Sequence, residues 1–161
     1  MSAATLQELT VRAPDGVEVP LEVFEAAHPR ARILMLPALG IQARLYRRLG
    51  GLLAEAGIDM TALEQRGHGR SALRASRRCD FGFREWLTAD IPAALDGLHA
   101  REPRVPVFLA GHSLGGHLAL MARSLHPDRV AGVVLLTTAT PYYRCYQRVN
   151  TVQNRVLVHS V

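Results

Sequence analysis

The stretch Val105-Pro-Val-Phe-Leu-Ala-Gly-His-Ser-Leu-Gly-Gly116 joins a short apolar run to a serine flanked by glycines. Val105 to Ala110 predicts a buried strand, and Leu114 to Leu125 predicts a helix. Between them, the pattern G-x-S-x-G leaves small residues two positions before and after Ser113, as a sharp strand-to-helix turn requires. Such a turn aims backbone N–H groups and the positive end of the helix at the serine. The stretch therefore predicts that Ser113 is a nucleophile.

Short apolar runs and helical patterns alternate on both sides of this turn. The strands are expected at Ile33–Leu36, Ile58–Leu63, Val105–Ala110 and Val130–Thr137, and helices at Ala43–Ala56, Arg84–Ala100 and Leu114–Leu125. Pro92 predicts a kink or a late start in the second helix. Leu6–Arg12 and Val17–Phe24, separated by Pro-Asp-Gly, predict a hairpin. The fold class is α/β, with a mostly parallel sheet, helices on both faces and an N-terminal antiparallel hairpin.

The composition is that of an ordinary globular domain, with 161 residues, 48% of them hydrophobic and 20% charged. All nineteen basic residues are arginines, and the net charge is +5. They are spread along the chain rather than gathered on one segment, which argues against a nucleic-acid partner. Cys79 and Cys145 have no metal or redox spacing. The sequence shows no signal segment and no apolar run long enough to span a membrane, so we expect a cytoplasmic protein. We also expect that it needs no metal.

A glycine-rich strand-to-helix turn can also bind phosphate. However, the chain has no lysine for a P-loop, and G-x-G-x-x-G fails because Ser113 stands where a glycine is needed. With motif and context in agreement, the sequence resembles the α/β-hydrolase superfamily, in its esterase, lipase and serine-aminopeptidase-like branch.

A second motif carries the same resemblance. The segment Glu64-Gln-Arg-Gly-His-Gly-Arg-Ser71 is similar to the family's D-x-R-G-x-G-x-S loop, apart from Glu for Asp. The resemblance implies that Arg66 and Gly67 support the active-site rim, and that Gly111, Gly115 and Gly116 support the turn at Ser113. His68 is the weaker alternative as a catalytic base. In the helix entry that follows, aromatic residues are expected to pack and Asp80 and Asp90 to cap.

Pro37-Ala-Leu-Gly40 occupies the place of the family's oxyanion loop, often H-G-x-G. The resemblance implies that the N–H groups of Leu114 and Leu39 hold an oxyanion. It also implies hydrolysis of a small-molecule carboxylic ester, or of an amide, through an acyl-enzyme on Ser113 and without a cofactor.

The acid and the base of a catalytic triad are not visible. In this fold the order is Ser, acid, His, yet Asp128 is the sole acid after Ser113, and His117, His126 and His159 are the histidines. We therefore expect a chain truncated after the strand that follows the serine, with residues 1–140 as the N-terminal part of a hydrolase domain and 141–161 as a divergent tail. The alternative is a catalytically silent fragment or interaction module, whose uncovered sheet edge invites self-association.

Overall fold

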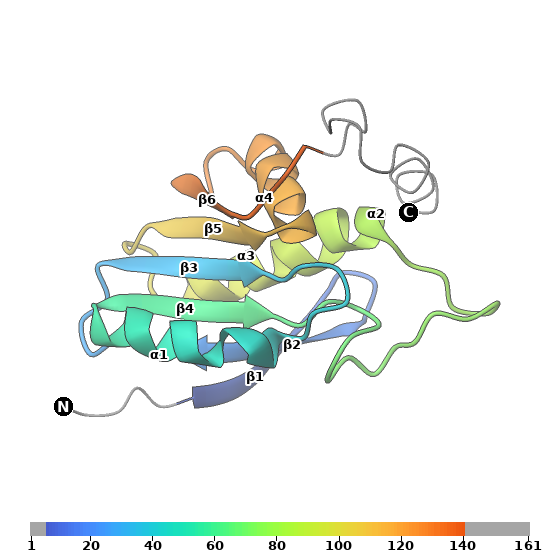
Figure 1. Cartoon of the computed structure of the whole chain (residues 1–161), viewed down its shortest axis with the longest axis horizontal. Coiled ribbons are helices and arrows are strands. Elements are labelled where there is room, and N and C mark those ends of the chain that lie inside the picture. The colour runs from blue at the N-terminus through green and yellow to red at the C-terminus, as the bar shows by residue number, and fades with distance from the viewer. Residues whose placement is uncertain (1–5, 141–161) are drawn as a thin grey trace, which may run out of the picture.

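Six strands form one sheet in the computed structural model, which describes residues 6–140 (Figure 1). The order across the sheet is β1-β2-β4-β3-β5-β6, with β1–β2 and β2–β4 antiparallel and the other pairs parallel. The bounds are β1 Leu6–Arg12, β2 Glu18–Phe24, β3 Ala31–Leu36, β4 Ile58–Leu63, β5 Val107–His112 and β6 Gly132–Leu136. The predicted fold class is confirmed.

Helices cover both faces of the sheet (Figure 1). On one face, η1 and α1 pack over Phe24, Met35 and Met60, and on the other, α3 and α4 enclose Leu34 and Leu109. The helices are η1 Ala43–Tyr46, α1 Arg47–Glu55, α2 Phe83–Glu85, η2 Trp86–Asp90, α3 Ile91–Arg101 and α4 Leu114–Leu125. Because the carboxyl ends of β3, β4 and β5 share one edge, the loops after these strands meet there.

The segment before α3 differs from the expected single helix. After the short α2, η2 is a π-turn in which the Ile91 N–H donates to the Trp86 carbonyl. Pro92 follows directly, at the second residue of α3, and it has no N–H to donate to the helical backbone that continues from η2. The helix is thus interrupted beside Pro92 as expected, by a π-turn rather than by a late start. The expected capping is wrong, since Gly82 precedes α2 and Asp90 makes no capping bond.

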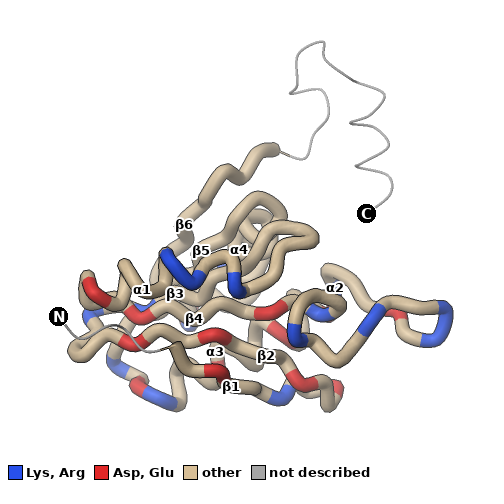
Figure 2. Tube along the Cα trace, turned by 60° about the horizontal axis from the view of Figure 1, so that its bottom comes forward, with Lys and Arg blue, Asp and Glu red and all other residues tan. Residues whose placement is uncertain are grey.

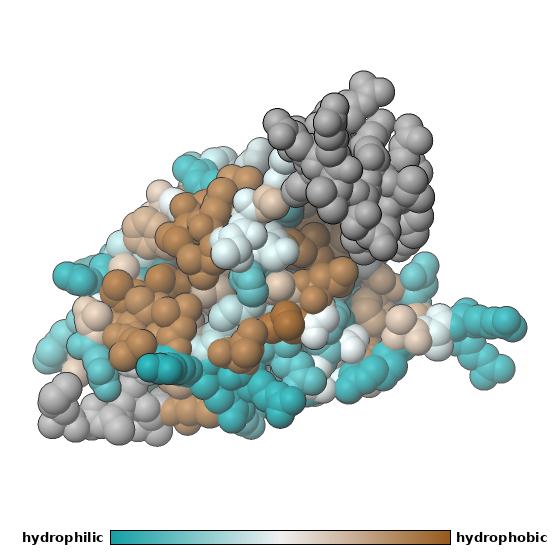
Figure 3. Space-filling view, in the orientation of Figure 1, coloured by the Kyte–Doolittle hydropathy of each residue, from teal (hydrophilic) through white to brown (hydrophobic). Residues whose placement is uncertain are grey.

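Strand β6 lies at the edge of the described sheet, and each of its faces is partly exposed. Val134 is 42% exposed and Leu135 is 46% exposed, although neighbouring residues of a strand point to opposite faces. Figure 3 shows the resulting apolar surface over β6. Self-association through this edge stays a prediction, as does the domain boundary at residue 140, and the proposed tail 141–161 lies outside the described residues.

Charged residues occur along most of the described chain, but few lie in α4 and none in β6. Basic and acidic segments alternate along the chain in Figure 2, with a basic stretch on the loop that joins β4 to α2. No helix within residues 6–140 is long and apolar enough to cross a membrane.

Two adjacent glycines in α1 offer a test of how this helix packs. A Cβ on Gly50 would lie 2.7 Å from Cε2 of Phe24, whose ring is buried, whereas a Cβ on Gly51 would meet nothing within 4 Å. We expect Gly50→Ala to lower the free energy of unfolding by about 1–3 kcal/mol through overpacking. Gly51→Ala should raise it by about 0.5–1 kcal/mol, because alanine favours a helix. Urea denaturation measures both, and equal values for the two variants would contradict the packing of α1 on Phe24.

Candidate active site

The backbone turns sharply at Ser113, between the end of β5 and the start of α4. Ser113 is exposed and has φ 52° and ψ −114°, a conformation that residues with a side chain rarely adopt. Its N–H donates to the Leu136 carbonyl at 3.0 Å, so β6 holds the turn from one side. This strained strand-to-helix geometry is the one that the G-x-S-x-G pattern predicts.

The three glycines around Ser113 permit close approaches that a side chain would block. A Cβ on Gly111 would overlap the backbone of Gly115, and one on Gly116 would overlap the hydroxyl of Thr138. A Cβ on Gly115 would lie 2.6 Å from the carbonyl carbon of Leu36 and 2.7 Å from the carbonyl oxygen of Pro37. The start of α4 is therefore pressed against the end of β3, where the predicted oxyanion loop begins.

Two backbone N–H groups near this junction have no hydrogen-bond partner among the described residues. One is the N–H of Leu114, the first residue of α4, where a helix leaves its N–H groups free. The other is the N–H of Leu39, in the turn after β3. Both are the groups that the family resemblance implies as oxyanion donors.

Tyr46 ties this turn to the strand that carries Ser113. The hydroxyl of Tyr46 accepts the Ala38 N–H at 3.2 Å and lies 2.9 Å from Nδ1 of His112, to which it can donate its proton. Burial raises the pKa of Tyr46, against the lowering effect of the Ala38 N–H, so the phenol stays protonated. Residues separated by 66 positions are thus joined at the edge of the site.

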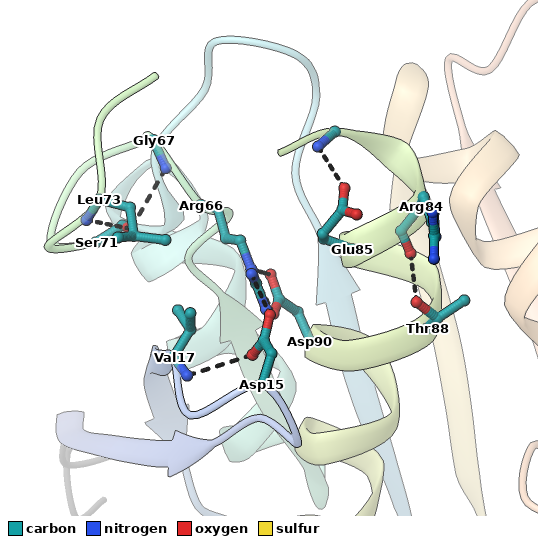
Figure 4. A network of polar contacts seen from close by, with 11 residues as sticks. Asp15, Val17, Arg66, Gly67, Ser71, Leu73, Arg84, Glu85, Thr88 and Asp90 are labelled. Atoms are coloured by element: carbon teal, nitrogen blue, oxygen red, sulfur yellow. Dashed lines mark hydrogen bonds and ion pairs between the residues drawn. The ribbon is translucent and has the colours of Figure 1, made fainter. Parts of the chain in front are cut away.

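The loop of residues 64–71, called the rim motif here, folds around the buried carboxylate of Glu64. Glu64 replaces the family's aspartate; its carboxylate accepts the N–H groups of Ala43 at 3.1 Å and Arg70 at 3.3 Å. The hydroxyl of Ser71 accepts the Gly67 N–H at 3.3 Å, which closes the loop on itself (Figure 4). These hydrogen bonds from backbone N–H groups fix the conformation of the loop.

Arg66 lies between two aspartates from distant parts of the chain (Figure 4). Its guanidinium donates to Asp90 at 2.6–2.9 Å and to Asp15, in the β1–β2 turn, at 2.6 Å. Arg66 is 4% exposed and Asp90 is fully buried. The hydrogen bond from Arg66 lowers the pKa of Asp15, whereas desolvation raises the pKa of Asp90 against the pull of the same guanidinium.

The candidate bases among residues 6–140 form no histidine–carboxylate pair beside Ser113. His126 and Asp128 follow the far end of α4, about 18 Å along the axis of this 12-residue helix. His117 lies within α4, and His159 lies outside the described residues. From residue 6 to residue 140, no histidine nitrogen has a hydrogen bond to a carboxylate, and no group of three or more His, Cys, Asp or Glu could hold a metal.

A pocket of about 360 Å³ opens beside Leu39 and the rim motif. Its wall combines Leu39 and His68 with the aromatic side chains of Phe81, Phe83 and Trp86. The aromatic residues thus pack at the rim, as expected, and line a space of the size that a small organic group fills.

Comparison with known proteins identifies the family of this chain. Residues 27–160 match the family model described as "Serine aminopeptidase, S33". The chain belongs to the serine aminopeptidase S33 family. Among the curated relatives, human monoglyceride lipase is 29% identical over 109 residues, covering 68% of this chain and 35% of that protein. Lipase LipV of Mycobacterium tuberculosis is 33% identical, covering 68% and 38%.

The structural neighbours of this S33 chain are α/β hydrolases. A thermostable carboxyl esterase from Bacillus coagulans superposes with a TM-score of 0.72 at 21% identity, covering 99% of this chain and 52% of that one. At this identity the likeness concerns the fold. The S33 chain spans about a third of the two lipases and about half of the esterase.

Sequence reasoning missed three residues that hold the candidate site of this S33 chain together, Tyr46, Asp15 and Asp90. Tyr46 looked like one more apolar position of a helix, and Asp15 like a turn residue. Asp90 looked like a helix cap, although Arg66 of the rim motif was a signal that a carboxylate should face it if the arginine is buried.

Proposed function

We propose that this chain carries the nucleophile and the oxyanion hole of a serine hydrolase acting on a small-molecule carboxylic ester, with an amide as the alternative substrate. The Ser113 oxygen adds to the substrate carbonyl carbon, and the carbonyl oxygen becomes an oxyanion beside the N–H groups of Leu114 and Leu39. The bond to the leaving alcohol then breaks, and the alcohol takes the proton that Ser113 lost. Water attacks the acyl-enzyme, which releases the carboxylic acid and restores the serine.

One observation carries this proposal. The exposed Ser113 is held at φ 52° between β5 and α4, beside a turn whose Leu39 N–H has no partner among residues 6–140. A strained backbone at a surface serine costs on the order of 1–3 kcal/mol and persists where its orientation is used. The two lipases among the similar proteins support an ester as substrate.

The second candidate is a catalytically silent module. Its support is that no histidine is hydrogen-bonded to a carboxylate within the described residues. Without a base, Ser113 would keep its proton, and the oxyanion hole alone gives rates orders of magnitude below those of a full triad.

A fluorophosphonate probe separates the two candidates. For the hydrolase, we expect the purified chain to be phosphonylated at Ser113 and to turn over a p-nitrophenyl ester, and Ser113→Ala to lose both by about 1,000-fold or more. Ser124→Ala, at an exposed serine of the same helix, is the matched control and should retain both. Peptide mass spectrometry locates the adduct. A folded chain that the probe does not modify would favour the silent module.

A further inference from the structure

The turn that carries Leu39 is closed by its own backbone. The Ile41 N–H donates to the Ala38 carbonyl at 3.1 Å, and Gly40 has φ +77°, as the third residue of a type II turn requires. In such a turn the N–H of the second residue, here Leu39, has no partner within the turn. Its direction is therefore set by whatever holds the residues on either side of it.

Both neighbours of Leu39 are held by side chains from other elements. The Ala38 N–H donates to the Tyr46 hydroxyl at 3.2 Å, and the Gly40 N–H donates to Nε2 of His68 at 3.2 Å. We propose that His68 is a positioning residue, which fixes the Leu39 N–H as an oxyanion donor by accepting the N–H of Gly40. The oxyanion role in this inference rests on the proposed function, but the hydrogen bond between Gly40 and His68 can be tested without activity.

His68 is itself fixed through Arg66. Its Nδ1 lies 3.0 Å from the Arg66 carbonyl oxygen, an acceptor, so Nδ1 carries the proton. Nε2 must then offer its lone pair to Gly40, which makes the ring a neutral Nδ1–H tautomer. The ring packs against Trp86, with centroids 6.2 Å apart. The chain of contacts runs from buried Asp90 through Arg66 and His68 to Gly40.

This geometry changes the role of His68 from that of a candidate base. A general base needs a free lone pair directed at the nucleophile, and the lone pair of His68 is used by Gly40. Instead, the histidine gives the rim motif a task at the site: it sets the angle of one backbone donor. An error of about 1 Å in such a donor can cost about 100-fold in rate.

The test uses two variants with matched shapes. His68→Phe keeps a flat ring but removes the acceptor, while the amide oxygen of His68→Gln can take the place of Nε2. The first readout is the water-exchange rate of the Gly40 amide, measured by NMR on the folded chain. We expect His68→Phe to raise it about 10-fold, as the loss of one hydrogen bond predicts, and His68→Gln to stay within about 3-fold of the parent. In the parent, the ring ¹⁵N shifts of His68 should show the Nδ1–H tautomer.

The second readout is the rate at which the fluorophosphonate modifies Ser113. His68→Phe should lower it by about 10- to 100-fold and His68→Gln should restore most of it. His28→Phe, at an exposed histidine before β3, is the control and should leave both readouts unchanged. An unchanged Gly40 exchange rate in His68→Phe overturns the positioning role, whatever the labelling shows. If the parent is not modified at Ser113 but Gly40 exchange responds, the hydrolase proposal fails and the His68 contact stands.

Discussion

Substitution of Gly115 by alanine is expected to lower the free energy of unfolding by about 3 kcal/mol or more. The added Cβ would overlap the carbonyl oxygen of Leu36 and lie 2.6 Å from its carbonyl carbon. These are backbone atoms of β3, which is paired with β4 on one side and β5 on the other. A flexible side chain could move away, but a central strand cannot without breaking its ladders. The loss is a large part of the roughly 5–15 kcal/mol of a typical domain.

Urea denaturation of Gly115→Ala measures this loss, and Gly51→Ala is the matched control because its new methyl group would meet only solvent. The same displacement would separate Ser113 from the turn that carries Leu39. Any Gly115→Ala molecules that remain folded should therefore react with the fluorophosphonate more slowly than the parent. A variant with parental stability would mean that α4 begins farther from β3 than the structure places it.

The sequence predicted the bounds of those elements whose ends carry clear local signals. β1 and β4 and helix α4 have the bounds that the sequence gives, because turns, glycines and apolar runs mark both of their ends. β5 is shifted by two residues toward its carboxyl end. It pairs with β6 through Gly111 and His112, opposite Leu135 and Leu136, so the glycine of the motif belongs to the strand rather than to the turn.

The polar contacts around the site could not be read from the sequence, because they join residues that are far apart. Arg66 contacts Asp90 and Asp15, 24 and 51 positions away, and Tyr46 contacts His112 at a separation of 66. Periodicity reports which face of an element is buried, not which polar group meets it there. The sequence could thus suggest Ser113 and Leu39 as candidates by pattern, while the polar contacts around them follow from the order of the strands in the sheet.

Removal of Arg66 is expected to have the second large effect on stability, and one that depends on pH. In Arg66→Met, the fully buried Asp90 loses its partner, which costs about 3–5 kcal/mol at neutral pH. Burial already raises the pKa of Asp90, and without the guanidinium we expect that pKa to rise further. In Arg66→Met, Asp90 can become neutral by binding a proton. In the converse variant Asp90→Asn, Arg66 could not become neutral, because arginine does not lose its proton in proteins.

The sign of the pH dependence follows from the two aspartates. A carboxyl group whose pKa is raised in the folded state contributes most to stability below its pKa in the unfolded chain, about 3.9. This contribution falls as the pH rises through the pKa of the folded state. Asp15 acts in the opposite sense in the parent, since Arg66 lowers its pKa and the stability it adds is lost in acid. Both effects make the free energies of unfolding of the parent and of Arg66→Met more similar as the pH falls. In urea denaturation, the unfolding free energy that Arg66→Met loses relative to the parent should therefore be larger at about pH 7.5 than at about pH 4.5.

Two controls distinguish the loss of a buried partner from a general loss of charge. Asp96→Asn breaks the pair with Arg129, in which the Asp96 side chain is 74% exposed, and should cost less than about 1 kcal/mol. The double variant Arg66→Met/Asp90→Leu removes both buried charges and should recover most of the stability at neutral pH, because well-packed apolar residues can replace a buried pair. If the single variant lost the same free energy at both pH values, Asp90 would be staying charged without Arg66, which requires water or another donor at a carboxylate that the structure buries completely.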